Sequence, residues 1–176
     1  DGVWLVELGP LTDPALLPQT VAALLSVREE PGHPLLKTLT DALRTRALLL
    51  ILDNCEHLID ACAQFAEAVL RACPEVRILA SSREALGIAG ETPFRVPSLS
   101  SPDPEHVSDL ATLAQYEAVR LFVDRVVASK PDFTLTEANA AAVTQVRSQL
   151  DGLPLALELA AARARAMTVE QIAARL

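Results

Sequence analysis

The sequence contains no hydrophobic stretch long enough to cross a lipid bilayer. Its longest uninterrupted apolar run, Ala47 to Leu52, falls far short of the roughly 20 residues that a membrane-spanning helix needs. No basic segment followed by a cleavable apolar one is present either, so a secretion signal is not recognisable. We therefore expect a soluble, cytoplasmic protein without a membrane partner.

Positive charge and cysteine are also scarce. Asp and Glu outnumber Lys and Arg by 23 to 15, which leaves a net charge of −8. Nucleic acids and anionic membranes are polyanions, so this balance argues against nonspecific binding to either. Cys55, Cys62 and Cys73 are odd in number and are not spaced as Cys-x-x-Cys pairs, which favours reduced thiols over a disulfide framework.

Residues 3–82 alternate between strand and helix patterns. The expected elements are strands at 3–8, 47–52 and 76–80, and helices at 14–26, 35–45 and 56–72, with a further short strand at 94–96. The run at 47–52 is apolar at every position, which is typical of a strand covered on both faces within a parallel sheet. The pattern predicts an α/β fold with an open parallel sheet.

The composition changes after this region. Residues 97–104 are rich in Pro and Ser and show no periodicity, which is typical of a linker. The segments beyond it have helical patterns, at about 108–129, 136–149, 154–166 and 168–176. The predicted organisation is a partial α/β core at 1–97, a linker at 98–105 and an all-α subdomain at 106–176.

Three residues near the ends of predicted strands could handle a phosphate or a metal. Asp53 follows the apolar run, where P-loop NTPases place a carboxylate that holds Mg²⁺. Glu56 could activate a water molecule, and Arg83 could contact a terminal phosphate. Each also has a structural explanation: a turn residue, a helix-start acid and a solvated surface cation. Because parallel strands end at one edge, we expect Asp53 and Arg83 to face one crevice.

Two other groups of residues have structural interpretations. Gly152-Leu153-Pro154 could start the following helix or contact a ligand, because Gly permits a tight turn and Pro suits the first helical position. Cys55, His57 and Cys62 are soft metal ligands, but His57 and Cys62 are ~140° apart around a helix and cannot converge on one ion. We therefore do not expect a metal site at these three residues.

Four strings occur in an order and at a spacing that resemble a known family. They are LLLILDNCEHL (48–58), RILASSREALGIAGE (77–91), EAVRLFVDRV (117–126) and LDGLPLALELAAARARAMTVEQIAARL (150–176). Together they resemble the ATPase domain of bacterial transcriptional regulators of the LuxR and antibiotic-regulator types. That domain belongs to the NB-ARC-like branch of the STAND signalling NTPases. The resemblance covers essentially the whole chain.

The resemblance implies roles for five positions. Asp53 is implied to be the Walker B acid that helps hold Mg²⁺, with Asn54 where many relatives have a second Asp. Glu56 is the remaining candidate for polarising the attacking water, so the implied catalytic pair is Asp53 and Glu56. Arg83 matches the phosphate-sensing Arg, and Pro154 matches the residue that packs near the nucleotide base. The implied ligands are ATP or ADP with Mg²⁺.

The sequence lacks the Walker A loop that such a domain needs. The pattern GxxxxGK[ST] supplies the amides and the Lys that cradle the phosphates, and the nearest string, residues 32–38, has Leu36 in place of the second Gly. We therefore expect a fragment that starts after the P-loop. Family topology would place the missing P-loop strand between the strands at 76–80 and 94–96, so the latter should lack a partner on its inner side.

The leading hypothesis is a nucleotide-dependent signalling switch. ATP and ADP would favour different arrangements of the two subdomains, and slow ATP hydrolysis in the full-length protein would reset the switch. The output would be transcriptional control through a DNA-binding domain outside these residues, and residues 1–176 alone should bind ATP weakly or not at all. The alternative is a protein-interaction module with a decayed nucleotide site, whose helical half contacts protein partners or a second copy.

Overall fold

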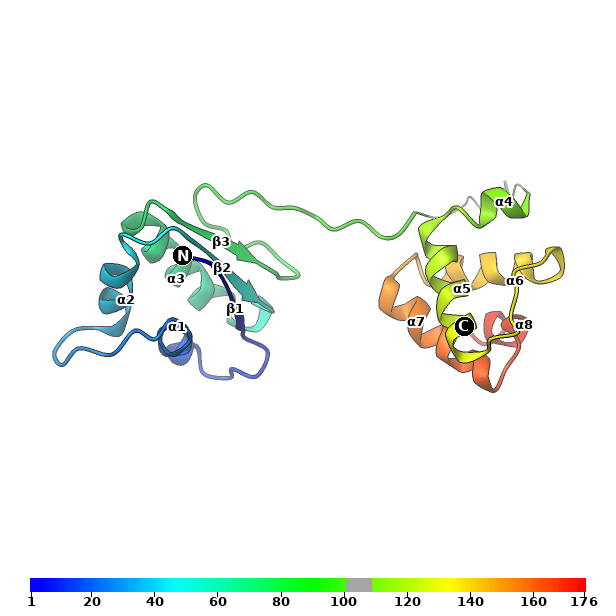
Figure 1. Cartoon of the computed structure of the whole chain (residues 1–176), viewed down its shortest axis with the longest axis horizontal. Coiled ribbons are helices and arrows are strands. Elements are labelled where there is room, and N and C mark those ends of the chain that lie inside the picture. Colours follow the sequence, from blue (N-terminus) through cyan, green and yellow to red (C-terminus); the bar gives the residue numbers. More distant parts are fainter. Residues whose placement is uncertain (101–108) are drawn as a thin grey trace. The chain divides into compact units, whose positions relative to one another are not determined.

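The computed structural model of the chain describes residues 1–100 and 109–176. The chain divides into two compact units, Asp1–Phe94 and Arg95–Leu176 (Figure 1). The first unit is mixed α/β and the second is helical. The predicted linker at 98–105 is described only as far as Ser100; the rest of it lies outside the described residues.

The first unit is built on a three-stranded parallel sheet. Its strands are β1 (Val3–Glu7), β2 (Leu48–Asp53) and β3 (Val76–Ala80), in the spatial order β1-β2-β3. Glu7 lies beside Asp53 in the register, and Leu52 lies beside Ala80. The carboxyl ends of all three strands therefore meet at one edge, as the sequence pattern predicts.

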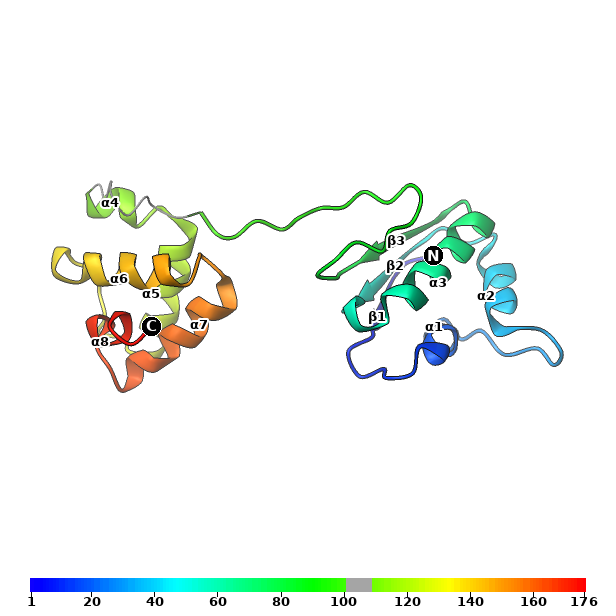
Figure 2. The same cartoon turned by 180° about the vertical axis from the view of Figure 1, so that it is seen from behind.

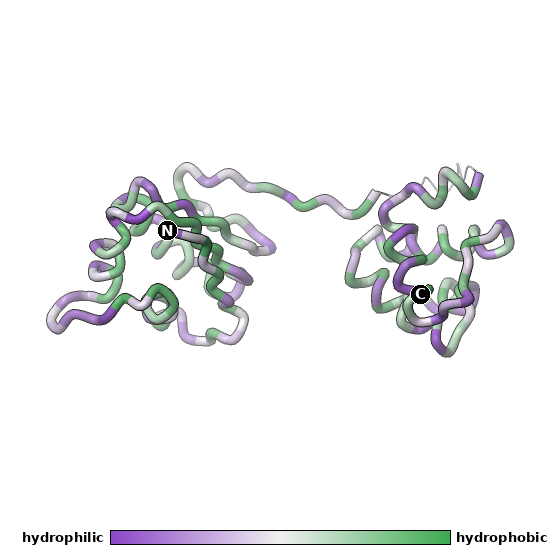
Figure 3. Tube along the Cα trace, in the orientation of Figure 1, coloured by the Kyte–Doolittle hydropathy of each residue, from purple (hydrophilic) through white to green (hydrophobic). Residues whose placement is uncertain are grey.

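Helices cover one face of this sheet. They are α1 (Leu17–Leu24) after the 3-10 turn η1 (Pro14–Leu16), α2 (Leu35–Leu43), and α3 (Ile59–Ala72) after the 3-10 turn η2 (Glu56–Leu58). Asp13 starts the first of them, because its carboxylate accepts the Ala15 N–H at 2.9 Å. The strands are strongly hydrophobic, and the loop between α1 and α2 is hydrophilic (Figure 3).

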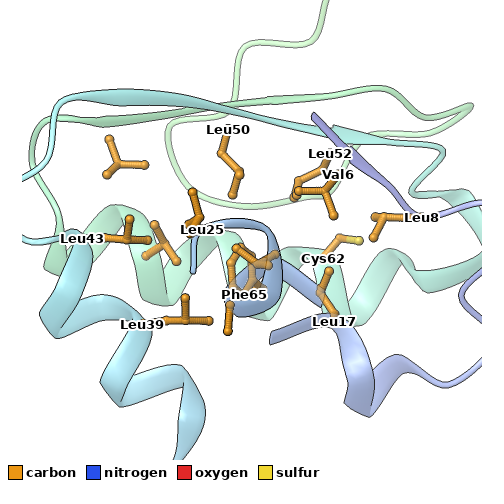
Figure 4. Close-up of a cluster of buried hydrophobic side chains, with 14 of the residues drawn as sticks. Val6, Leu8, Leu17, Leu25, Leu39, Leu43, Leu50, Leu52, Cys62 and Phe65 are labelled. Atoms are coloured by element: carbon orange, nitrogen blue, oxygen red, sulfur yellow. The ribbon is translucent and has the colours of Figure 1, made fainter. Parts of the chain in front are cut away.

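The core lies between the sheet and these helices. Leu50 and Leu52 of β2 face the helices, where they meet Phe65 and Cys62 of α3 and Leu17 of α1 (Figure 4). All five side chains are buried. Full burial of a Leu or Phe side chain contributes about 1.5–3 kcal/mol, so this layer supplies most of the driving force for folding of the unit. The same layering can be followed from behind in Figure 2.

The second face of the sheet is open within the described residues. The register puts Leu5, Ile51 and Leu79 side by side on that face. Leu5 and Leu79 are 51% and 56% exposed, and Ile51 is only half-buried. The prediction that β2 is covered on both faces is therefore wrong for this part of the chain. An apolar run indicates what a strand can bury, whereas the first unit provides helices for one face of the sheet only.

The predicted strand at 94–96 does not form. Phe94 is 82% exposed, Val96 is exposed, and neither belongs to the sheet. A strand needs a hydrogen-bonded neighbour, and within the described residues β3 pairs with β2 alone. Pro93 and Pro97 flank the segment and have no N–H to donate to a ladder. The edge of β3 that the resemblance assigns to a P-loop strand is thus unpaired in this part of the chain.

The second unit is a cluster of helices. They are α4 (Leu110–Leu113), α5 (Glu117–Ser129), α6 (Glu137–Gln149), α7 (Pro154–Ala162) with the 3-10 turn η3 (Arg163–Arg165), and α8 (Val169–Ala173). Phe122, Val143, Leu157 and Ile172 come from four of these helices and are fully buried in one core. No helix of the described residues is both long and apolar enough to span a membrane.

Residues Leu99 and Ser100 are held by the helical unit. The Leu99 N–H donates to the Gly152 carbonyl at 3.1 Å. Ser100 N–H donates to Glu117 at 3.0 Å, and Glu117 N–H donates to the Ser100 hydroxyl at 3.1 Å. Gly152 has φ +65°, and a Cβ there would lie 2.8 Å from the Leu99 carbonyl oxygen. We call the contact between the main chains of Leu99 and Gly152 the Leu99–Gly152 clasp.

Candidate functional site

The candidate site lies at the carboxyl edge of the sheet. Asp53 is the last residue of β2, and Ser81, Ser82 and Arg83 directly follow β3. Because the two strands are adjacent and parallel, their final residues emerge side by side. The structure thus brings the predicted acid and the segment with the predicted sensor to the same edge.

Ser81 makes the closest contacts of this edge with the turn after β2. Its hydroxyl donates to Asp53 Oδ1 at 2.5 Å and accepts the Asn54 N–H at 2.9 Å. Its main chain continues the ladder, since Ser81 N–H donates to Leu52 and the Ser81 carbonyl accepts from Cys55, each at 2.9 Å. Asp53 is exposed, and one oxygen of its carboxylate, Oδ1, accepts a hydrogen bond from the Ser81 hydroxyl.

Asn54 connects the edge to His57. Asn54 has φ +68°, a left-handed conformation that Asn tolerates better than most residues. His57 Nε2 lies 3.1 Å from the Leu8 carbonyl and 2.9 Å from the Leu11 carbonyl. Both oxygens can only accept, so Nε2 carries the proton, and in the neutral ring Nδ1 accepts from the Asn54 amide at 3.3 Å. The ring ties the loop after β1 to the turn after β2.

Glu56 and Arg83 form an ion pair across the same edge. Arg83 Nε lies 3.3 Å from Glu56 Oε1, and Glu56 is the first residue of η2. The Arg83 side chain is 89% exposed and that of Glu56 24% exposed. The two candidates for phosphate sensing and water activation are therefore partners of each other, and the guanidinium keeps most of its donors toward solvent.

The oxygen atoms at this edge are of the kind that bind Mg²⁺ in nucleotide sites. Asp53, Asn54 and Glu56 offer hard oxygen atoms, which Mg²⁺ prefers. Within the described residues no group of three or more His, Cys, Asp or Glu side chains could hold a metal ion on its own. Mg²⁺ is commonly held by one or two carboxylates plus the phosphates of a substrate, and Asp53 meets that smaller requirement.

Pro154 lies in the helical unit. It is the first residue of α7, where a Pro needs no N–H and has the right φ, so the helix-start interpretation is confirmed. Its neighbours Leu153 and Leu155 are exposed. Its contact with a nucleotide base stays a prediction, because the site described above belongs to the other unit.

The cysteines serve the core and not the site. Cys55, Cys62 and Cys73 are all free and buried. The hydrogen bond with Cys62, together with burial, raises the pKa of the Cys55 thiol, and burial raises the pKa of Cys73. A neutral buried thiol is a poor nucleophile, so we assign Cys55 to the hydrophobic core and not to the chemistry of the strand-end residues.

Two mycobacterial proteins resemble the chain over nearly its whole length. The chain is 43% identical over 173 residues to "Putative HTH-type transcriptional regulator Rv0890c" of Mycobacterium tuberculosis, which covers 98% of this chain and 18% of that protein. It is also 37% identical over 175 residues to an uncharacterized protein of the same organism, 99% of this chain and 41% of that protein. The chain thus spans about a fifth of the regulator's length. No protein-family model matches the chain.

The sequence analysis singled out Asp53, Asn54, Glu56 and Arg83, whose roles stay predictions, but it did not identify Ser81 and His57, which contact Asp53 and Asn54. The sequence places Ser81 after a predicted strand but does not indicate a partner for its hydroxyl. The register between β2 and β3 brings that hydroxyl to Asp53. His57 was set aside as an unsuitable metal ligand. The carbonyl groups that it binds lie 46 and 49 residues away in sequence, so no local signal could have revealed them.

Proposed function

We propose that this chain forms part of a nucleotide-dependent switch domain in a transcriptional regulator. In this proposal the first unit binds the phosphates of ATP or ADP with Mg²⁺, and the helical unit changes its arrangement with the nucleotide. The phosphate-binding loop lies outside these 176 residues, because the sequence has no GxxxxGK[ST] pattern. A separate DNA-binding domain delivers the output, in keeping with the helix-turn-helix regulator that the chain resembles.

The observation that carries this proposal is the meeting of Asp53, Glu56 and Arg83 at one sheet edge. β2 and β3 are adjacent and parallel, and Arg83 reaches Glu56 at 3.3 Å. A carboxylate for a metal, a second carboxylate for a water molecule and a cation for a phosphate are the groups that phosphoryl transfer uses. Finding all three at one edge favours a nucleotide site over three separate structural roles.

The residues divide the work as follows. Asp53 would hold Mg²⁺ through a bound water molecule, and the metal ion would supply positive charge to the phosphate oxygens. Arg83 leaves Glu56 for the terminal phosphate, because a phosphate oxygen carries more charge than a carboxylate oxygen and offers several acceptors. Glu56, freed from its partner, accepts a proton from water. In the ADP state Arg83 returns to Glu56, so the ion pair reports which nucleotide is bound.

Calorimetric titration of the full-length protein with ATP and ADP tests this proposal. Asp53→Ala should abolish the gain in affinity that Mg²⁺ provides, since the metal loses its carboxylate. Arg83→Ala should bring the ATP and ADP affinities together, since the sensor of the terminal phosphate is gone. Folding of each variant is checked by circular dichroism.

Two exposed residues serve as matched controls for these substitutions. Asp60 lies in the first turn of α3 and Arg71 in its last turn, and neither follows a strand. Asp60→Ala and Arg71→Ala should leave both titrations unchanged. A folded wild-type protein that binds neither nucleotide in the presence of Mg²⁺ contradicts the proposed function.

A second candidate is a protein-interaction module with a decayed nucleotide site. The observation in its favour is an apolar stripe on α7, where Leu155 and Leu159 are exposed one helical turn apart. The absence of a Walker A loop from the sequence agrees with it. Leu155→Glu with Leu159→Glu should abolish partner binding in this case, whereas nucleotide binding by the full-length wild-type protein would favour the switch.

A further inference from the structure

Ser81 places all of its polar groups on the end of β2 and on the turn that follows it. Its N–H and carbonyl bind Leu52 and Cys55 on the two sides of that turn. Its hydroxyl lies between the Asn54 N–H, from which it accepts, and Asp53 Oδ1, to which it donates. One short side chain directly after β3 therefore holds both the backbone of the turn and the carboxylate of Asp53 before it.

The hydroxyl orients the carboxylate of Asp53. A serine hydroxyl has a single proton, and the Asn54 N–H occupies one of its lone pairs, so its proton is directed at Oδ1. Within residues 1–100 and 109–176, no hydrogen bond reaches the second oxygen, Oδ2. An exposed Asp side chain would otherwise rotate about two bonds, and this contact restricts it to orientations that present Oδ2 away from Ser81.

We propose that Ser81 is the positioning residue for the metal-binding carboxylate of Asp53. It holds Oδ1 so that Oδ2 remains available for a water molecule of Mg²⁺. This role rests on the proposed function and adds a residue that the family resemblance does not assign. Ser81 touches neither metal nor nucleotide, so its contribution should be seen in Mg²⁺-dependent affinity and not in nucleotide affinity as such.

The test compares ADP binding in Mg²⁺ with ADP binding in EDTA, by calorimetry on the full-length protein. Partners that orient a metal ligand typically contribute 10–100-fold to metal affinity, and at this exposed site we expect Ser81→Ala to reduce the Mg²⁺-dependent gain about tenfold. Binding in EDTA should stay at the wild-type value. Ser81→Thr keeps the hydroxyl and should restore the gain.

The neighbouring serine provides the control. Among the residues that the structure describes, the Ser82 hydroxyl accepts the Glu84 N–H at 3.4 Å and makes no bond to Asp53. Ser82→Ala should therefore behave as wild type in both titrations. An unchanged Mg²⁺-dependent gain in Ser81→Ala overturns the positioning role, and so does an equal loss of binding in Mg²⁺ and in EDTA, which indicates general damage to the edge. A wild-type protein that binds no nucleotide overturns the proposed function, and the positioning role with it.

Discussion

The guanidinium of Arg83 lies 3.3 Å from the carboxylate of Glu56, and this ion pair joins the segment after β3 to the helix that follows β2. Both groups were candidates for phosphate chemistry from the sequence alone, and each neutralises the other in the structure. The Arg83 side of this pair is highly exposed, so the guanidinium can be exchanged to another partner, because water already solvates it. That property suits a contact that has to open when a phosphate arrives.

The Arg83–Glu56 pair should contribute little to stability. Double-mutant measurements of exposed pairs give about 0.2–1 kcal/mol, so Arg83→Gln should lower the free energy of unfolding by less than about 1 kcal/mol. Urea denaturation of the 176-residue chain measures this value. Glu56→Gln should give a similar small loss, and a loss above about 2 kcal/mol in either variant would indicate a structural role instead of a switching one.

Gly152→Ala should destabilise the helical unit by breaking the Leu99–Gly152 clasp. The added methyl group would lie 2.8 Å from the Leu99 carbonyl, and the φ of +65° is strained for Ala. Together these effects should cost about 1–3 kcal/mol. Gly87 has φ +73° with open space around it, so Gly87→Ala isolates the strain alone and should cost about 1 kcal/mol. Thermal unfolding measures the loss of stability in each variant. Equal losses of stability would rule out a clash between the added methyl group at position 152 and the Leu99 carbonyl.

The contact between Ser100 and Glu117 should weaken in acid. Hydrogen bonds from Ser100 lower the pKa of Glu117 below its ordinary value of 4.5. The folded state therefore holds the ionised form more tightly, and the stabilisation is present above pH 4.5 and lost as the pH falls through the lowered folded pKa. Hydrogen exchange of the Ser100 amide, corrected for its intrinsic rate, should show protection falling over this range.

Glu117→Gln provides the control for this pH dependence. The amide oxygen of Gln still accepts the Ser100 N–H but does not titrate. Protection of the Ser100 amide should then be lower than in the wild type at neutral pH and constant through the acid range. A wild-type protection factor that stays flat from pH 6 to pH 3 would contradict the assignment.

The two faces of the sheet should respond differently to truncation. Leu50 is fully buried against the helices, so Leu50→Ala should cost about 2–5 kcal/mol. Leu79 lies on the open face and is 56% exposed, so Leu79→Ala should cost less than about 1 kcal/mol in the 176-residue chain. Urea denaturation measures both. A Leu79→Ala cost that rises in the full-length protein would mean that another segment covers this face.

Local patterns predicted the elements of the first unit well. β3 spans Val76–Ala80, as the apolar run indicates, and the acid at position 13 caps the first helical turn. These features depend on near neighbours in sequence: periodicity of apolar residues, a capping side chain and a helix-breaking proline. The meeting of Asp53 and Arg83 followed from the parallel order of β2 and β3, which short strand-helix-strand connections favour.

The failures share a different cause. A strand at 94–96 needs a neighbour that the described residues do not supply, and β-propensity alone cannot create one. Ser81 and His57 form hydrogen bonds to groups that are distant in sequence and that only the fold brings close. Gly152 is required because the main chain of Leu99 lies against it. Such contacts between distant segments leave no local trace in a single sequence.

Within the described residues one edge of β3 is unpaired, and this has a consequence for how the chain behaves in concentrated solution. A strand edge beside apolar side chains is a template on which another molecule can add its own strand and begin an aggregate. Arg77 is exposed on β3 and lies in register with Leu49. Its side chain places a positive charge on this edge strand. Salt screens such a charge, so we expect association between molecules to increase as ionic strength rises. Arg77→Leu should remove this dependence on salt.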